Sequence, residues 1–172
     1  IYVAHRYYDK AKTEVLFPFG YGLSYTKYTY SALECDLFPQ EGGVMRVQFE
    51  VCNAGQREGS EIAQVYIGKR GSAVHRPVRT LAGFQRVHLK PGERKRVCIE
   101  IPWSEFAVWE TASHSFAVEN GAYEICVGAN SREILLKEFV YPDGRLLEAT
   151  DAESAHGPYG EFSGNDFPNE AF

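Results

Sequence analysis

The stretch VMRVQFEVCN, residues 44–53, decides the fold class. Val47, Phe49 and Val51 alternate with polar and charged residues, which is the period of two expected for a strand with one buried face. The stretch EIAQVYIG, residues 61–68, is more apolar and predicts a central strand that is buried on both faces. Both stretches are bounded by clusters of glycine, asparagine and proline that favour turns. The chain is therefore expected to be built from strands and tight turns.

Seven such segments follow one another with turn residues between them, which predicts an antiparallel β-sandwich of the immunoglobulin or fibronectin type III kind. The predicted strands are residues 27–38, 44–53, 61–68, 79–89, 94–101, 122–128 and 133–141. A helical turn is expected only within residues 102–111. No Cys…Trp…Cys pattern of a true immunoglobulin domain is evident, so the fibronectin type III topology fits better.

The two ends of the chain differ from this all-β centre. Residues 1–26 are dense in aromatic side chains and predict an irregular segment whose rings pack against the sandwich or against a neighbouring domain. Residues 142–172 hold seven acidic residues and one basic residue, together with four glycines and three prolines, and predict an extended acidic tail or linker. The expected organisation is thus an aromatic segment (1–26), a sandwich (27–141) and a tail (142–172).

Charge is distributed unevenly over the 172 residues, whose net charge is -5. Residues 69–96 carry nine basic residues and one acidic residue. Such a run can dock an acidic protein surface, although solvated strand faces are the simpler interpretation. No recognition helix or single-strand-binding signature supports a nucleic-acid partner, and no apolar run is long enough for a transmembrane helix.

The four cysteines, at positions 35, 52, 98 and 126, show neither a disulfide framework nor a metal-ligand spacing. Cys52, Cys98 and Cys126 lie in apolar-rich runs, where a thiol is expected to pack as a small hydrophobic side chain. No metal and no cofactor are expected. The absence of a glycosylation sequon and of a disulfide pattern favours the bacterial cytoplasm.

Several motifs resemble one known family. Tyr7-Tyr8-Asp9 and the string FPFGYGLSYT, residues 17–26, look like the join between the α/β sandwich domain and the C-terminal fibronectin type III-like domain of family 3 glycoside hydrolases. The stretches 51–55 (VCNAG), 63–67 (AQVYI) and 123–131 (YEICVGANS) are similar to strands and turns of that domain, in the same order. The resemblance covers about residues 2–141, and the tail matches nothing in it.

The resemblance implies a domain that is not itself catalytic. The family's nucleophilic Asp lies in a Ser-Asp-Trp context on a barrel domain, and its acid/base Glu comes from the α/β sandwich domain; this chain contains neither. The implied role is an accessory domain in an enzyme that hydrolyses β-linked glucosides or xylosides. Its partners are then catalytic domains upstream or downstream in the same protein, and carbohydrate is reached only through them.

Two sets of site residues follow from the resemblance. Candidates for the contact with the catalytic domains are Tyr7, Tyr8, Asp9, Phe17, Phe19, Tyr21 and Tyr25. Candidates for a loop near an active-site mouth are Arg70, His75 and Arg76. Two other functions remain open from the residues: an independent carbohydrate-binding module that stacks sugars on Trp103, Trp109 and Tyr66, and a protein-docking module that uses the basic run.

Overall fold

The computed structural model describes residues 2–38 and 43–147. One short α-helix precedes nine strands, and a 3₁₀ turn lies between the fifth and sixth strands. The elements are α1 (His5–Ala11), β1 (Tyr28–Phe38), β2 (Val44–Asn53), β3 (Gly59–Lys69), β4 (Thr80–Leu89), β5 (Arg94–Pro102), η1 (Trp103–Phe106), β6 (Ala107–Glu110), β7 (Ser115–Val118), β8 (Tyr123–Gly128) and β9 (Ile134–Val140).

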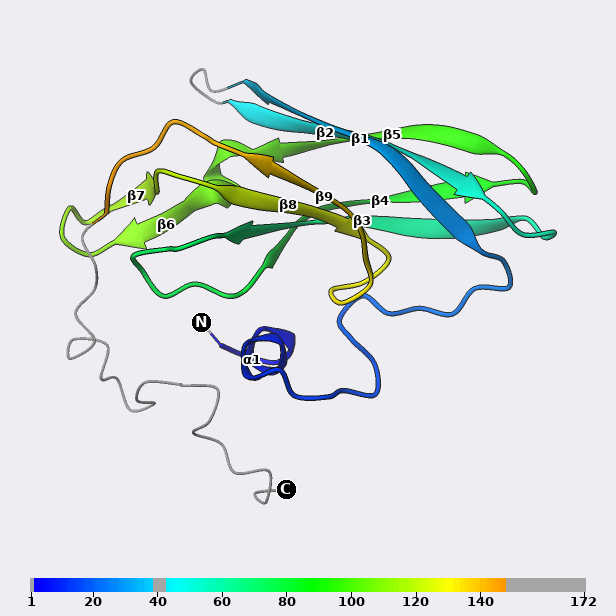
Figure 1. Cartoon of the computed structure of the whole chain (residues 1–172), viewed down its shortest axis with the longest axis horizontal. Coiled ribbons are helices and arrows are strands. Elements are labelled where there is room, and N and C mark those ends of the chain that lie inside the picture. Colours follow the sequence, from blue (N-terminus) through cyan, green and yellow to red (C-terminus); the bar gives the residue numbers. More distant parts are fainter. Residues whose placement is uncertain (1, 39–42, 148–172) are drawn as a thin grey trace.

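The strands form two stacked antiparallel sheets and one hairpin (Figure 1). The three-stranded sheet has the order β1-β2-β5, and the four-stranded sheet has the order β4-β3-β8-β9. Among the strands of the described residues, β6 and β7 pair only with each other. This architecture confirms the predicted all-β sandwich.

The core lies between the two sheets and contains the residues that the alternating pattern points inward. Val47, Phe49 and Val51 of β2 are fully buried and belong to one cluster with Val65 and Val127 of the opposite sheet. At one end of the core, the ring of Phe106 packs edge-to-face on that of Tyr123 at 5.2 Å between centroids. Each large apolar side chain buried in this way contributes about 1.5–3 kcal/mol to folding.

Two features differ from the sequence prediction. The strand count is nine, because residues 107–118 fold into the β6–β7 hairpin after the expected helical turn, which is the 3₁₀ turn η1. The segment predicted to be irregular contains α1, which has seven residues, none of them buried, and no side-chain cap at its N-terminus. A helix this short gives no reliable period in the sequence, and it forms here because neighbouring residues attach it to the sandwich.

The N-terminal segment (residues 2–26) lies over part of the outer face of the four-stranded sheet (Figure 1). Tyr66 and Cys126 are opposite each other in the register of β3 and β8 and point away from the core, yet both are fully buried. Cys126 therefore packs as predicted, whereas Cys98 on β5 is exposed, because none of the described segments covers the outer face of its sheet.

At the other end of the described chain, residues 142–147 return to the sandwich. The backbone N–H of Arg145 donates to the carbonyl of Val118 at 3.0 Å, and that of Asn120 donates to the carbonyl of Arg145 at 2.9 Å. The predicted acidic tail beyond residue 147 lies outside the described residues. No helix among the described residues is long and apolar enough to cross a membrane.

Candidate domain interface

The N-terminal segment is held on the four-stranded sheet by hydrogen bonds to its backbone. Gln64 Nε2 donates to the carbonyl oxygens of Gly20 (3.1 Å) and Ala129 (2.6 Å), and the N–H of Ser131 donates to the carbonyl of Phe19 at 2.9 Å. Gly20 adopts a φ of +80°, and a Cβ there would lie 2.1 Å from Gln64 Oε1. Glycine is therefore required where the segment crosses the sheet.

An ion pair fixes α1 to the loop between β8 and β9. Arg132 Nε donates to Asp9 Oδ1 at 3.0 Å, and an Arg132 terminal amine donates to the carbonyl of Thr13 at 2.8 Å. One guanidinium thus holds both the helix and the turn that follows it. Arg132 was not predicted as a site residue, because it lies 123 positions from Asp9 in the sequence and no local pattern connects them.

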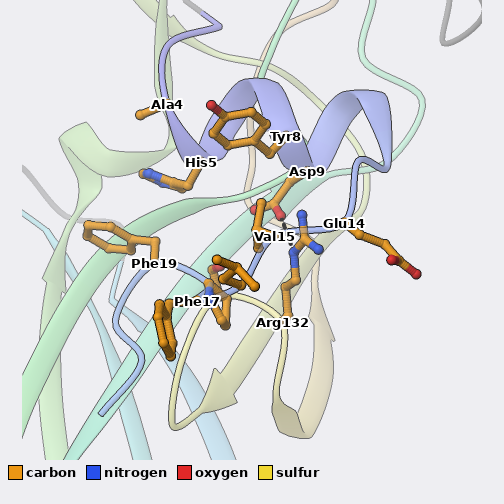
Figure 2. Close-up of a pocket in the computed structure, with 12 residues that line it drawn as sticks. Ala4, His5, Tyr8, Asp9, Glu14, Val15, Phe17, Phe19 and Arg132 are labelled. Carbon is orange, nitrogen blue, oxygen red and sulfur yellow. Dashed lines mark hydrogen bonds and ion pairs between the residues drawn. The ribbon is translucent and has the colours of Figure 1, made fainter. Parts of the chain in front are cut away.

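Between α1, the following loop and Arg132 lies an open cavity of about 490 Å³ (Figure 2). Figure 2 shows the rings of His5, Phe17 and Phe19 on one side and the Asp9–Arg132 pair on the other. The rings of His5 and Phe19 are stacked, with centroids 4.2 Å apart. Burial lowers the pKa of His5, which favours the neutral imidazole against the apolar ring. His5 is a second cavity residue that the sequence prediction missed.

The predicted interface rings remain accessible. Phe17 is 70% exposed and Tyr25 is 91% exposed, while Tyr8, Phe19 and Tyr21 keep about two fifths of their surface accessible and Tyr7 is half-buried. Leu16 and Leu23 are also almost fully exposed. None of these side chains belongs to the sandwich core. A concentration of exposed apolar side chains on a segment whose backbone is fixed in place is typical of an interaction surface.

The predicted loop residues Arg70, His75 and Arg76 divide into two groups. His75 is exposed, and Arg70 is exposed but bonds to Glu124 at 2.9 Å. Arg76 points into its own domain: only 14% of its side chain is exposed, its Nε lies 3.6 Å from Glu119 Oε2, and it donates to the carbonyl of Phe106. Arg76 therefore anchors the loop, and contact of Arg70, His75 and Arg76 with an active-site mouth remains a prediction.

The three aromatic residues of the carbohydrate-binding alternative do not form one platform. Tyr66 is fully buried beneath the N-terminal segment, and Trp103 packs against Phe106 at 5.2 Å. Trp109 is half-exposed, but its ring meets Phe116 edge-on, at 78° between planes. A buried ring cannot stack on a sugar, and two crossed rings offer no flat surface to one.

The basic run 69–96 does not form one patch either. Its members belong to different sheets, and five of its nine basic residues pair with acidic residues of this chain. On β5, Arg94 pairs with Glu50 and Arg96 pairs with Glu34. Among the described residues, no group of three or more histidine, cysteine or acidic side chains is arranged to hold a metal ion.

Comparison with known proteins identifies a matching family model and similar proteins. A family model described as a fibronectin type III-like domain matches residues 61–131. The thermostable β-glucosidase B of Acetivibrio thermocellus is 41% identical over 141 residues, which cover 81% of this chain and 19% of the relative. The structure of β-glucosidase 3B from Thermotoga neapolitana in complex with α-D-glucose matches at 40% identity, with a TM-score of 0.76, over 84% of this chain and 20% of that one.

A GH3 β-glucosidase from Bifidobacterium adolescentis also superimposes, at 31% identity and a TM-score of 0.76, over 88% of this chain and 23% of that structure. This chain contains a fibronectin type III-like domain of the kind found in family 3 glycoside hydrolases. It is homologous to the C-terminal region of their β-glucosidases. The domain spans about one fifth of the length of these relatives, which are larger single chains.

Proposed function

We propose that this fibronectin type III-like domain is an accessory domain of a glycoside hydrolase, and that its N-terminal segment is the surface pressed against the other domains of the same protein. The division into an aromatic join (1–26), a sandwich (27–141) and a tail (142–172) belongs to this proposal. The partner domains would carry the two carboxylates of a retaining hydrolase acting on β-linked glucosides or xylosides. Carbohydrate would then be bound by those domains and reached by this one only through them.

One observation carries the proposal: the N-terminal segment is fixed to the sheet through Gln64, Ser131 and Arg132, yet leaves its apolar side chains in solvent. If the segment only stabilised the sandwich, we would expect its aromatic rings to pack against the four-stranded sheet. Complete burial of an exposed aromatic ring on docking contributes about 1.5–3 kcal/mol. Several such rings are enough to hold two domains of one chain in a fixed orientation.

A chimera tests the proposal, in which this chain replaces the homologous part of Thermotoga neapolitana β-glucosidase 3B. We expect the chimera to hydrolyse an aryl β-glucoside and the 172-residue chain alone to give no turnover. Phe17→Ser should lower the melting temperature of the chimera by several degrees but leave that of the isolated chain within about 1 °C.

Phe116→Ser is the matched control, because Phe116 is 72% exposed and lies on the β6–β7 hairpin, away from the N-terminal segment. It should leave both melting temperatures nearly unchanged. Equal effects of the two substitutions on the chimera would contradict the proposed surface. Turnover by the isolated chain that a point substitution abolishes would contradict the accessory role.

A further inference from the structure

A second hollow adjoins the aromatic cavity and is basic. It has a volume of about 310 Å³ and is lined by Asp9, Lys12, Val78, Arg79, Ser131 and Arg132. Asp9, Ser131 and Arg132 line both spaces, so the two hollows are direct neighbours. Three cationic side chains and one carboxylate leave this hollow with a net charge of +2.

Two of the three cations have no acidic partner among the described residues. The guanidinium of Arg132 is paired with Asp9, whereas Arg79 donates only to the carbonyl of Ser131, at 3.1 Å. Lys12 makes no ion pair within the described part of the chain. Lys12 is the C-cap residue that follows α1, in the left-handed conformation (φ 55°), and it lines the hollow beside Arg79.

The side chain of Ser131, which also lines this hollow, carries a buried hydroxyl group. The residue is 2% exposed, and within the described residues its hydroxyl has no hydrogen-bond partner. A buried polar group without a partner costs about 1–3 kcal/mol. An unpaired hydroxyl at the wall of a hollow lined by unpaired cations indicates that a polar group from outside the described residues completes this site.

We propose that this hollow receives a carboxylate, supplied by an aspartate or glutamate side chain of the domain that packs on the N-terminal segment. The inference rests on the proposed function. Guanidinium and ammonium groups make strong charge-assisted hydrogen bonds to carboxylates, and the free cations here match a single acidic side chain. The lining residues shared with the aromatic cavity put this contact in the same interface as Phe17 and Phe19. The rings supply apolar contact, and the acidic side chain fixes the orientation of the domains.

The 172-residue chain tests the charge preference directly, with acetate as the probe and acetamide as its neutral isostere. Titration followed by NMR should give saturable shifts of the Ser131 and Arg79 signals with acetate, at millimolar or higher concentrations, and none with acetamide. Arg79→Gln should weaken acetate binding by about tenfold, and Arg79→Lys should retain most of it. Arg86→Gln, which removes an exposed base of β4 outside the hollow, should leave it unchanged.

Inorganic phosphate is the competing probe, because a basic hollow can also hold a free anion. Phosphate that binds about ten times more tightly than acetate at matched ionic strength would overturn the assignment to a carboxylate. An identical response in Arg79→Gln and Arg86→Gln would show an adventitious ion only, and would overturn it as well. The folded state of each variant is verified from the dispersion of its amide spectrum.

The chimera separates this inference from the proposed function. Two double variants of the chimera are compared: Lys12→Gln with Arg79→Gln, and the control Arg86→Gln with Lys90→Gln. If Phe17→Ser destabilises the chimera but the two double variants lose the same stability, the docking surface is supported and the carboxylate contact is wrong. If neither the ring nor the cations affect the chimera, the proposed interface itself is wrong. If both do, a glutamate or aspartate of the partner domain whose substitution abolishes the effect of Arg79→Gln identifies the ligand.

Discussion

The outer faces of the two sheets are built from strands of the same kind but meet different surroundings. On the three-stranded sheet, charged side chains pair across strands in solvent: Arg46 lies 3.2 Å from Glu100, and Arg94 lies 3.0 Å from Glu50. On the four-stranded sheet, the corresponding outward positions include Tyr66 and Cys126, which are fully buried, and the N-terminal segment is hydrogen-bonded to Gln64 of the same face. The outer face of the three-stranded sheet is exposed to solvent, whereas part of the outer face of the four-stranded sheet is covered by the N-terminal segment.

This difference supports the proposed contact on one side of the sandwich. Exposed ion pairs contribute about 0–1 kcal/mol each and keep a face hydrated, so the three-stranded sheet needs no partner. The second layer on the four-stranded sheet presents rings and leucines outward, with Phe17, Leu16 and Leu23 among the most exposed. Docking is therefore expected on the side of the four-stranded sheet.

The largest loss of stability is expected from truncation of Tyr66. Its ring is fully buried under the N-terminal segment, and its hydroxyl donates to Gln64 Oε1. Tyr66→Ala should lower the free energy of unfolding by about 3–5 kcal/mol, because it removes a large buried ring and a partner of Gln64. Gln48→Ala, on the outer face of the other sheet, should change it by less than about 0.5 kcal/mol. Urea denaturation measures both, and a similar small loss at both positions would show that the second layer does not pack.

A smaller effect is expected where the N-terminal segment crosses the sheet. Gly20→Ala places a Cβ against Gln64 and forces alanine into a positive φ, which should cost about 1–3 kcal/mol and increase hydrogen exchange of residues 5–22. Gly22→Ala is the matched control, because a Cβ added there would meet nothing within 4 Å and its φ is not in the left-handed range. Equal stability of the two variants would argue against a tight attachment at Gly20.

The smallest expected effect is a pH dependence of the unfolding free energy, caused by the buried thiol of Cys126 on the four-stranded sheet. Burial raises the pKa of Cys126 to about 11, so the folded state retains a proton that the unfolded state loses above about pH 9. The contribution of Cys126 to stability is then present below about pH 9 and is lost as the pH rises toward 11. The difference in unfolding free energy between wild type and Cys126→Ala should shrink by about 1–2 kcal/mol over this range.

Thiol labelling at about pH 8, below the ordinary thiol pKa, gives an independent measure of the same difference. In native protein, Cys98 should react with a maleimide much faster than Cys126, because Cys98 is exposed and Cys126 is fully buried. Cys98→Ala identifies the fast site. Labelling of Cys126 as fast as that of Cys98 would show that the outer face of the four-stranded sheet opens readily at this position.

Much of the sandwich could be predicted from local patterns. The alternation of Val47, Phe49 and Val51 indicated the buried face of β2, and clusters of turn-forming residues indicated where the strands end. The β6–β7 hairpin was missed because its strands have four residues each, too few to show a period. The same limit concealed α1.

The candidate interface was predictable only in part. The aromatic density of residues 1–26 indicated a contact surface, and Asp9 was named through a resemblance in its motif. His5, Arg132, Lys12 and the role of Arg79 were missed, because the groups that define the two hollows come from segments far apart in the chain.

By itself, the sequence determined the alternation of the strands, the turns between them and hence the two-layer sandwich, because these depend on side-chain order over a few residues. Only the tertiary structure decided which outward face is covered, which cations remain unpaired and which rings stay in solvent. Those properties depend on the crossing of Gly20 over Gln64 and on the attachment of α1 by Arg132. In both contacts the residues lie far apart in the sequence, so no local sequence pattern predicts that they meet.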